Sequence, residues 1–202
     1  TFRDLSEYEN VDFQGFRGDI YVKEAIIPEG ASVIPKSQFF ECRSLEKVYL
    51  PESVSGIEDY AFADCHVLKV WESIEKLSLK SVGISAFENC YALEFVSLPD
   101  SLTVIGGAAF AECVSVNKLI FSDTSLLKKI GDHAFRGCRN LKEVYLPDSV
   151  EYVGVSAFRD CSSLEQISVS EKIKNQPGIA ELEKNCPNAR IRFREVNSVE
   201  KE

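Results

Sequence analysis

Seven cysteines and two histidines are the residues of this chain whose side chains could bind a metal, form disulfides or act as nucleophiles. The cysteines recur at alternating intervals of 23 and 25 residues, and they are Cys42, Cys65, Cys90, Cys113, Cys138, Cys161 and Cys186. A structural zinc site needs paired ligands roughly two to four residues apart, and no CxxC sequence occurs here. We therefore expect no metal site and no cofactor.

The same spacing bears on whether the cysteines form disulfides. Residues at one repeat position lie close together when repeats stack, but their Cβ vectors then run parallel, whereas a disulfide needs vectors that converge. We expect buried free thiols that serve as small apolar side chains. The cysteine count consequently does not identify a redox compartment.

The two histidines do not form a recognisable catalytic arrangement. His66 follows Cys65 and His133 precedes Ala134, and neither stands at a fixed small offset from a serine, a cysteine or a carboxylate pair. No GxSxG, Walker or GxGxxG sequence is present. The sequence predicts a protein that is not an enzyme, with no catalytic or cofactor-binding residues.

Charge and hydropathy exclude two classes of partner. The net charge is -9, and 23 basic residues are scattered among 32 acidic ones, whereas phosphate contact requires clustered Lys and Arg. Nucleic acid is therefore not an expected partner. No stretch approaches the roughly 20 apolar residues of a membrane span, so we expect no membrane insertion by this segment.

A tandem repeat positions the cysteines. A phenylalanine stands three residues before each of the first six, at Phe39, Phe62, Phe87, Phe110, Phe135 and Phe158. Apolar residues follow Cys42 at offsets of three, six and eight, as Leu45, Val48 and Leu50, and these offsets recur in later units. Proline ends several of these runs, and glycine follows the next Ile or Val, which suits a turn or a close backbone approach.

Each unit predicts one short strand and a return path too short for a crossover helix. Stacked units would form a solenoid with parallel strands about 4.8 Å apart. We expect an N-terminal cap over residues 1–15, tandem repeats over 16–170, a C-terminal capping unit over 171–194 and a polar tail over 195–202. The AlaPhexxCys segment is expected to form a single helical or 3₁₀ turn, and Trp71 to be a core residue.

The tandem LxxVxLPxSVxxIGxxAFxxC pattern, over roughly Phe16 to Ser170, resembles the BspA-type leucine-rich repeats. The asparagine that follows LxxLxL in the ribonuclease-inhibitor and plant classes is absent. The resemblance implies a right-handed leucine-rich repeat solenoid of short parallel β-strands with irregular, 3₁₀ or short-helical return segments. It also implies an extracellular or cell-surface protein of bacteria or protozoa, associated with adhesion.

The residues between the inward positions of each strand point to the outer face of the sheet. We define the candidate binding face as Lys47, Tyr49, Phe95, Lys118, Ile120, Glu143 and Tyr145. Aromatic residues flanked by charges are typical of a protein-binding patch. The alternative explanation is that Tyr and Phe are there because they pack well across strands.

The sequence therefore predicts a noncatalytic adhesion or recognition module that binds a host or microbial surface protein or a glycan. Two other functions fit the same repeats. The array could be a structural spacer that projects another domain, or a targeting domain of a larger enzyme. Repeats alone do not choose among the three.

Overall fold

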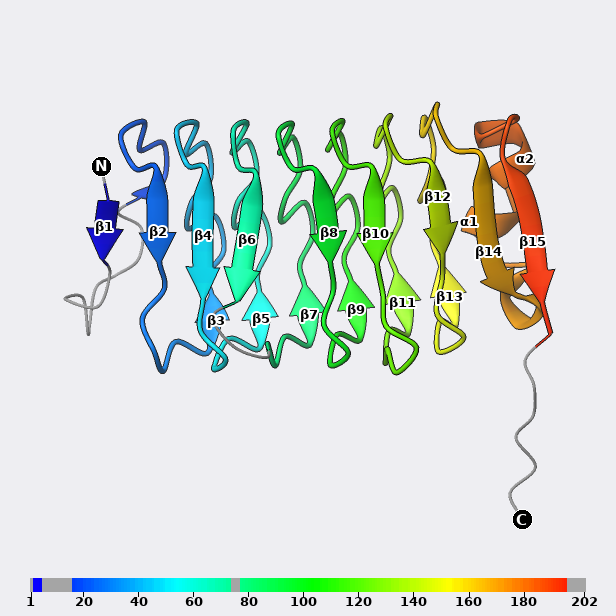
Figure 1. Cartoon of the computed structure of the whole chain (residues 1–202), viewed down its shortest axis with the longest axis horizontal. Coiled ribbons are helices and arrows are strands. Elements are labelled where there is room, and N and C mark those ends of the chain that lie inside the picture. The colour runs from blue at the N-terminus through cyan, green and yellow to red at the C-terminus, as the bar shows by residue number, and fades with distance from the viewer. Residues whose placement is uncertain (1, 5–15, 74–76, 196–202) are drawn as a thin grey trace, which may run out of the picture.

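The computed structural model describes residues 2–4, 16–73 and 77–195 and is a parallel β-solenoid of about seven turns. Each coil contributes one longer strand to the front of the molecule in Figure 1 and returns behind it. The parallel leucine-rich repeat solenoid predicted from the repeat is confirmed.

The longer strands form two parallel sheets. The first has the order β1 (Phe2–Asp4), β2 (Glu24–Ile26), β4 (Lys47–Leu50) and β6 (Val70–Ser73). The second contains β8 (Phe95–Ser97), β10 (Lys118–Ile120), β12 (Glu143–Tyr145), β14 (Gln166–Ser170) and β15 (Arg190–Arg194). In both sheets the middle residue of a three-residue strand is buried wherever burial is described, as the period-two alternation predicts.

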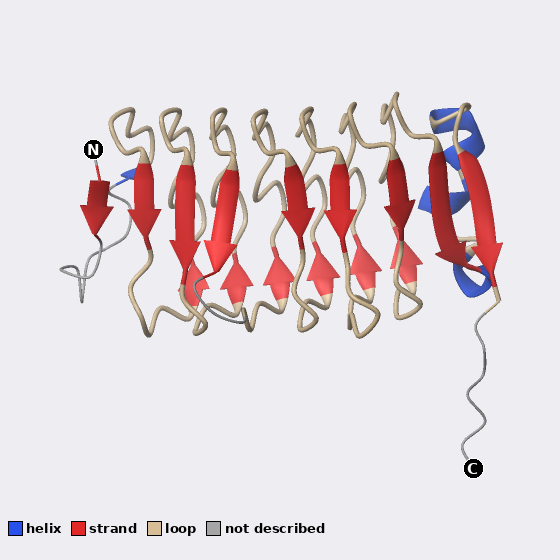
Figure 2. Ribbon diagram, in the orientation of Figure 1, coloured by secondary structure: helices blue, strands red, loops and turns tan. Residues whose placement is uncertain are grey.

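The return path is more regular than the sequence suggested. Each of six coils contains a two-residue strand, and these strands pair into a second parallel layer behind the front sheets (Figure 2). They are β3 (Val33–Ile34), β5 (Gly56–Ile57), β7 (Ser81–Val82), β9 (Val104–Ile105), β11 (Lys129–Ile130) and β13 (Tyr152–Val153). The second residue of each of these strands is an Ile or Val of the repeat, and it is buried.

The helical turn expected for the AlaPhexxCys segment is replaced by consecutive tight turns. Residues with left-handed backbone recur four apart in six of the coils, as at Tyr60 (φ 58°) and Asp64 (φ 61°). Backbone N–H groups of Ser37 and Phe39 reach across to the carbonyls of Asp59 and Ala61 at 3.0 and 2.7 Å. This segment is therefore a third ladder of hydrogen bonds between coils, beside the two layers of strands.

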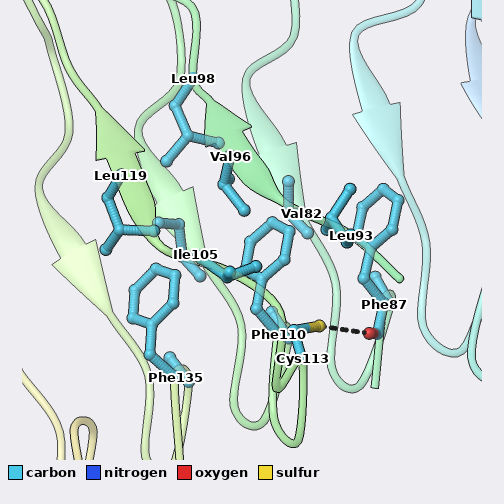
Figure 3. Close-up of a cluster of buried hydrophobic side chains, with 14 of the residues drawn as sticks. Val82, Phe87, Leu93, Val96, Leu98, Ile105, Phe110, Cys113, Leu119 and Phe135 are labelled. Atoms are coloured by element: carbon cyan, nitrogen blue, oxygen red, sulfur yellow. Dashed lines mark hydrogen bonds between the residues drawn. The ribbon is translucent and has the colours of Figure 1, made fainter. Parts of the chain in front are cut away.

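A column of phenylalanine rings runs through the core. The rings of Phe39, Phe62, Phe87 and Phe110 follow one another at centroid separations of 5.1 Å, and every ring from Phe39 to Phe158 is fully buried. Aliphatic residues from both strand layers surround this column (Figure 3). Consecutive coils therefore stack like on like, as the repeat requires.

The cysteines form a second internal column. Each thiol donates a hydrogen bond to the carbonyl oxygen of the repeat phenylalanine one coil earlier, as Cys113 does to Phe87 at 3.1 Å (Figure 3). All seven make this bond, at distances between 2.8 and 3.3 Å. All seven are free and buried, as expected from their parallel geometry. Burial raises the pKa of each thiol, that of Cys42 to about 12.

A glycine column lets the coils approach closely. A Cβ added at Gly106 would lie 2.5 Å from the carbonyl carbon of Gly83 in the preceding coil, and its φ is not in the left-handed region. Close backbone approach, rather than conformational freedom, is therefore the reason for glycine here.

Gly106→Ala is expected to destabilise the protein by about 1–3 kcal/mol, because two backbones must move apart to admit the methyl group. Gly107→Ala is the matched control, since its Cβ would meet only the Asp132 carbonyl oxygen, at 3.4 Å. Urea unfolding of both variants, followed by circular dichroism, measures the difference. Equal losses at the two positions would contradict the close-approach explanation.

The two ends of the array depart from the repeat. Phe16 begins the phenylalanine column and stacks on Phe39 at 5.6 Å, while Asp19, where a cysteine is expected, accepts hydrogen bonds from the N–H groups of Tyr21 and Val22. Of the predicted cap over 1–15, only β1 lies within the described residues, where it pairs with β2.

The predicted capping unit over 171–194 contains three short helices. They are η2 (Glu171–Ile173), α1 (Pro177–Ala180) and α2 (Leu182–Asn185), and β15 then closes the sheet edge. Beyond Glu195 the predicted polar tail lies outside the described residues.

Candidate binding surface

The seven residues of the candidate binding face all belong to front strands. Lys47 and Tyr49 lie on β4 of the four-stranded sheet, and the other five lie on β8, β10 and β12 of the five-stranded sheet. β6 and β8 are in different sheets, so the face is divided between two sheets (Figure 1).

Trp71 marks the last strand before this division. It pairs with Val48 and therefore takes an inward position, as expected, but it is only partly buried. Its ring contacts Phe87 of the following coil at 5.4 Å, tilted by 44°. An indole thus fills the position that valine occupies in the coil before it.

The five-stranded sheet brings its candidate residues into direct register. Lys118 lies between Phe95 and Glu143 on neighbouring strands. Because the pairing is parallel, Ile120 lies beside Tyr145 two residues further along. Phe95, Ile120 and Tyr145 are 41, 37 and 53% exposed, whereas Tyr49 and Lys47 are more buried than any of these three. The apolar part of the face is thus concentrated on the five-stranded sheet.

Tyr145 is held in place by a residue from the end of the chain. The Arg194 guanidinium lies 3.7 Å from the centre of the tyrosine ring, a cation–π contact. Arg194 also donates hydrogen bonds to the Leu146 carbonyl and the Asp148 carboxylate at 2.7 Å, and to the Ser168 hydroxyl at 2.9 Å. Tyr145 is therefore preorganised, with one face of its ring covered.

Two further face residues were missed by the sequence reasoning. Arg190 pairs with Gln166, and Arg192 with Ser168, so both arginines extend the outer rows of the sheet and both are exposed. After Cys186 the apolar residues come one position earlier than after the other cysteines, so the repeat pattern did not predict the register of β15. Its alternation of Arg with Ile191 and Phe193 was the available signal.

Elsewhere on the described surface, His66 and the hollow beside α2 are occupied by contacts within the chain. His66 stacks on Tyr91 at 4.7 Å, and its Nε2 lies 3.6 Å from the Asp64 carboxylate. In the polar hollow beside α2, the Glu181 carboxylate accepts hydrogen bonds from the N–H and hydroxyl of Ser156.

Across the ranges 2–4, 16–73 and 77–195, no group of three or more His, Cys, Asp or Glu side chains could hold a metal ion. The helices found there are all too short or too polar to cross a membrane.

Three solved bacterial structures resemble this chain. A leucine-rich repeat protein from Bacteroides ovatus is 22% identical with a TM-score of 0.61, over 92% of this chain and 64% of that one. The pneumococcal vaccine antigen PcpA is 27% identical with a TM-score of 0.66, over 74% of this chain and 41% of its own. A leucine-rich cell surface protein from Faecalibacterium prausnitzii is 23% identical with a TM-score of 0.53, over 92% and 63%.

This chain thus spans less than two thirds of the length of each of those three proteins. No curated protein matches it. The model of the BspA type leucine rich repeat region matches it in six copies, over residues 9–126 and 80–180. This match covers most of the chain, and the stacked phenylalanine, cysteine and glycine columns agree with it. The chain therefore belongs to the BspA type leucine rich repeat family.

Proposed function

We propose that this domain is a noncatalytic recognition module, that it binds a protein or glycan partner at the outer face of its front sheets, and that it works at or outside a bacterial cell surface. One observation carries the proposal. Phe95, Ile120 and Tyr145 stay exposed on three neighbouring strands whose inward residues already supply the core. A monomer gains little from such a row, whereas exposed aromatic and aliphatic groups beside charges are typical of binding surfaces.

The relatives support the location. They include a protein described as a cell surface protein and a vaccine antigen, and their family is built of repeats that present extended surfaces. Because this chain matches only part of each, the proposal concerns the repeat domain and leaves the rest of any longer protein aside.

The double variant Tyr49→Ala/Tyr145→Ala tests this function. We expect it to weaken partner binding by about thirtyfold or more, because loss of an interface hot spot commonly costs about 2 kcal/mol or more. Binding is measured against immobilised extracellular-matrix and plasma proteins and a glycan array. The stability loss should be about 1 kcal/mol, from the lost Arg194 contact.

Tyr21→Ala is the matched control, since Tyr21 is 73% exposed and lies outside the face. It should bind like the parent chain. If no panel member binds the parent, the spacer function is favoured instead. Binding that survives the double variant would place the site on another surface.

A further inference from the structure

The C-terminal end of the five-stranded sheet carries positive charge within an acidic chain. Arg190 and Arg192 are exposed on β15, and their guanidinium groups have neither an ion pair nor a hydrogen bond among the described residues. Arg194, on the same strand, is different because Asp148 neutralises it. Two cations on one strand face are thus available to a ligand, in a chain whose net charge is -9.

The neighbours of these arginines leave their charge intact. The paired residues on β14 are Gln166 and Ser168, which are neutral. Within the outer rows the nearest carboxylate is Glu143, which lies two strands away, about 10 Å at the usual strand spacing. At physiological ionic strength, charges beyond about 8 Å are largely screened, so Glu143 does little to offset the two arginines. The exposed Glu165 precedes Gln166 in the chain, but it forms no ion pair with either arginine among the described residues.

We propose that this end of the sheet binds an acidic, extended segment of a protein partner. Its carboxylates would pair with Arg190 and Arg192 while an apolar side chain packs on Ile120 and Tyr145. Since β12 and β15 are two strands apart, the two contacts are about 10 Å from one another, which roughly three residues of extended chain span. This inference names the ligand class of the proposed binding face and therefore rests on it.

The surroundings favour a peptide over an anionic sugar. Sugar rings bind by stacking on an open aromatic face, but one face of the Tyr145 ring is already covered by Arg194. Ile120 and Phe95 add exposed hydrocarbon without polar groups, which suits apolar side chains. Carboxylates suit the two guanidinium forks because they accept bidentate hydrogen bonds.

The test measures fluorescence polarisation of a labelled peptide of roughly twelve residues, with tyrosines placed three residues from glutamates, against the whole chain at about 0.15 M salt. We expect Arg190→Glu/Arg192→Glu to weaken binding about tenfold or more, since it reverses both contacts. The matched control is Arg43→Glu/Lys80→Glu, which changes net charge equally at two exposed, unpaired residues elsewhere on the described surface. The control should bind within about twofold of the parent.

Two further probes make the outcome decisive. The same peptide with glutamine in place of glutamate should bind about tenfold more weakly, and a heparin octasaccharide should compete poorly. The inference is overturned if the parent does not bind the peptide, if the arginine variant binds like the control, or if heparin is the stronger ligand. If a panel protein still binds through Tyr49 and Tyr145 in that case, the recognition function stands and only the acidic ligand class is wrong.

Discussion

Raising the pH from 8 to about 10 is expected to unfold this protein, because unfolding then releases protons from the seven thiols. Burial raises the pKa of every cysteine in the folded state, whereas an unfolded thiol titrates near about 8.5. The thiols therefore favour folding fully below that value. Their contribution falls as the pH rises above it, since only the unfolded chain gives up protons.

The expected size is large because the effect is repeated along the column. Each protonated thiol costs about 0.8 kcal/mol at pH 9 and about 2 kcal/mol at pH 10, from 1.36 kcal/mol per pH unit. The six most deeply buried of these groups together reach the roughly 5–15 kcal/mol of a typical domain somewhere above pH 9. Urea midpoints measured at half-unit steps from pH 7 to pH 10.5 follow the loss.

Cys113→Ala isolates the contribution of one buried thiol from that of the rest of the chain. Its free energy of unfolding should fall more gently with pH than that of the parent, by about 1.4 kcal/mol per pH unit above pH 9.5. The alanine lacks the hydrogen bond to Phe87, so its stability at pH 7 is lower, but that loss is independent of pH. Identical slopes for the two proteins would mean that buried thiols do not control alkaline stability.

The buried residues of this fold can be predicted from the sequence, because each apolar position of the repeat becomes a column of like residues in the core. The spacing of Phe110 and Cys113 is enough to place both in the core, and alternation along the strand places Phe95 outside. The third ladder of hydrogen bonds, at the residues with left-handed backbone, could not be predicted in this way. Its positions hold residues as different as Tyr60, Ala108 and Gly137, so no single residue type marks them, and the hydrogen bonds between coils hold the conformation.

The candidate face was predicted only as far as the repeat extends. Tyr145 was placed correctly on an outer row, but its partner Arg194 lies in the last unit, where no further coil packs against the strand. Without that neighbour, the constraint that keeps apolar residues at fixed offsets is lost. The arginines of β15 therefore became visible only through strand pairing in space.

Phe110→Ala should cost about 3–5 kcal/mol of folding free energy, the largest loss expected from one substitution in this chain. The ring is fully buried between Phe87 at 5.1 Å and Phe135 at 5.5 Å, so truncation leaves a cavity that both neighbours border. The coils above and below are held by backbone ladders on three sides, which limits their collapse into the space. Urea unfolding at pH 7 measures the loss directly.

Phe95→Ala is the matched control, because it removes the same side chain from the outer face of β8, where 41% of it is exposed. Its cost should stay below about 1 kcal/mol, since a large part of its area is already in contact with water and its loss leaves no enclosed cavity. The contrast also bears on function. A phenylalanine that contributes little to stability on the face, beside one that is indispensable in the core, is free to serve a partner. Similar losses for the two variants would show that the outer row is held by packing within the sheet, and the case for a binding face would then rest on the arginines of β15 alone.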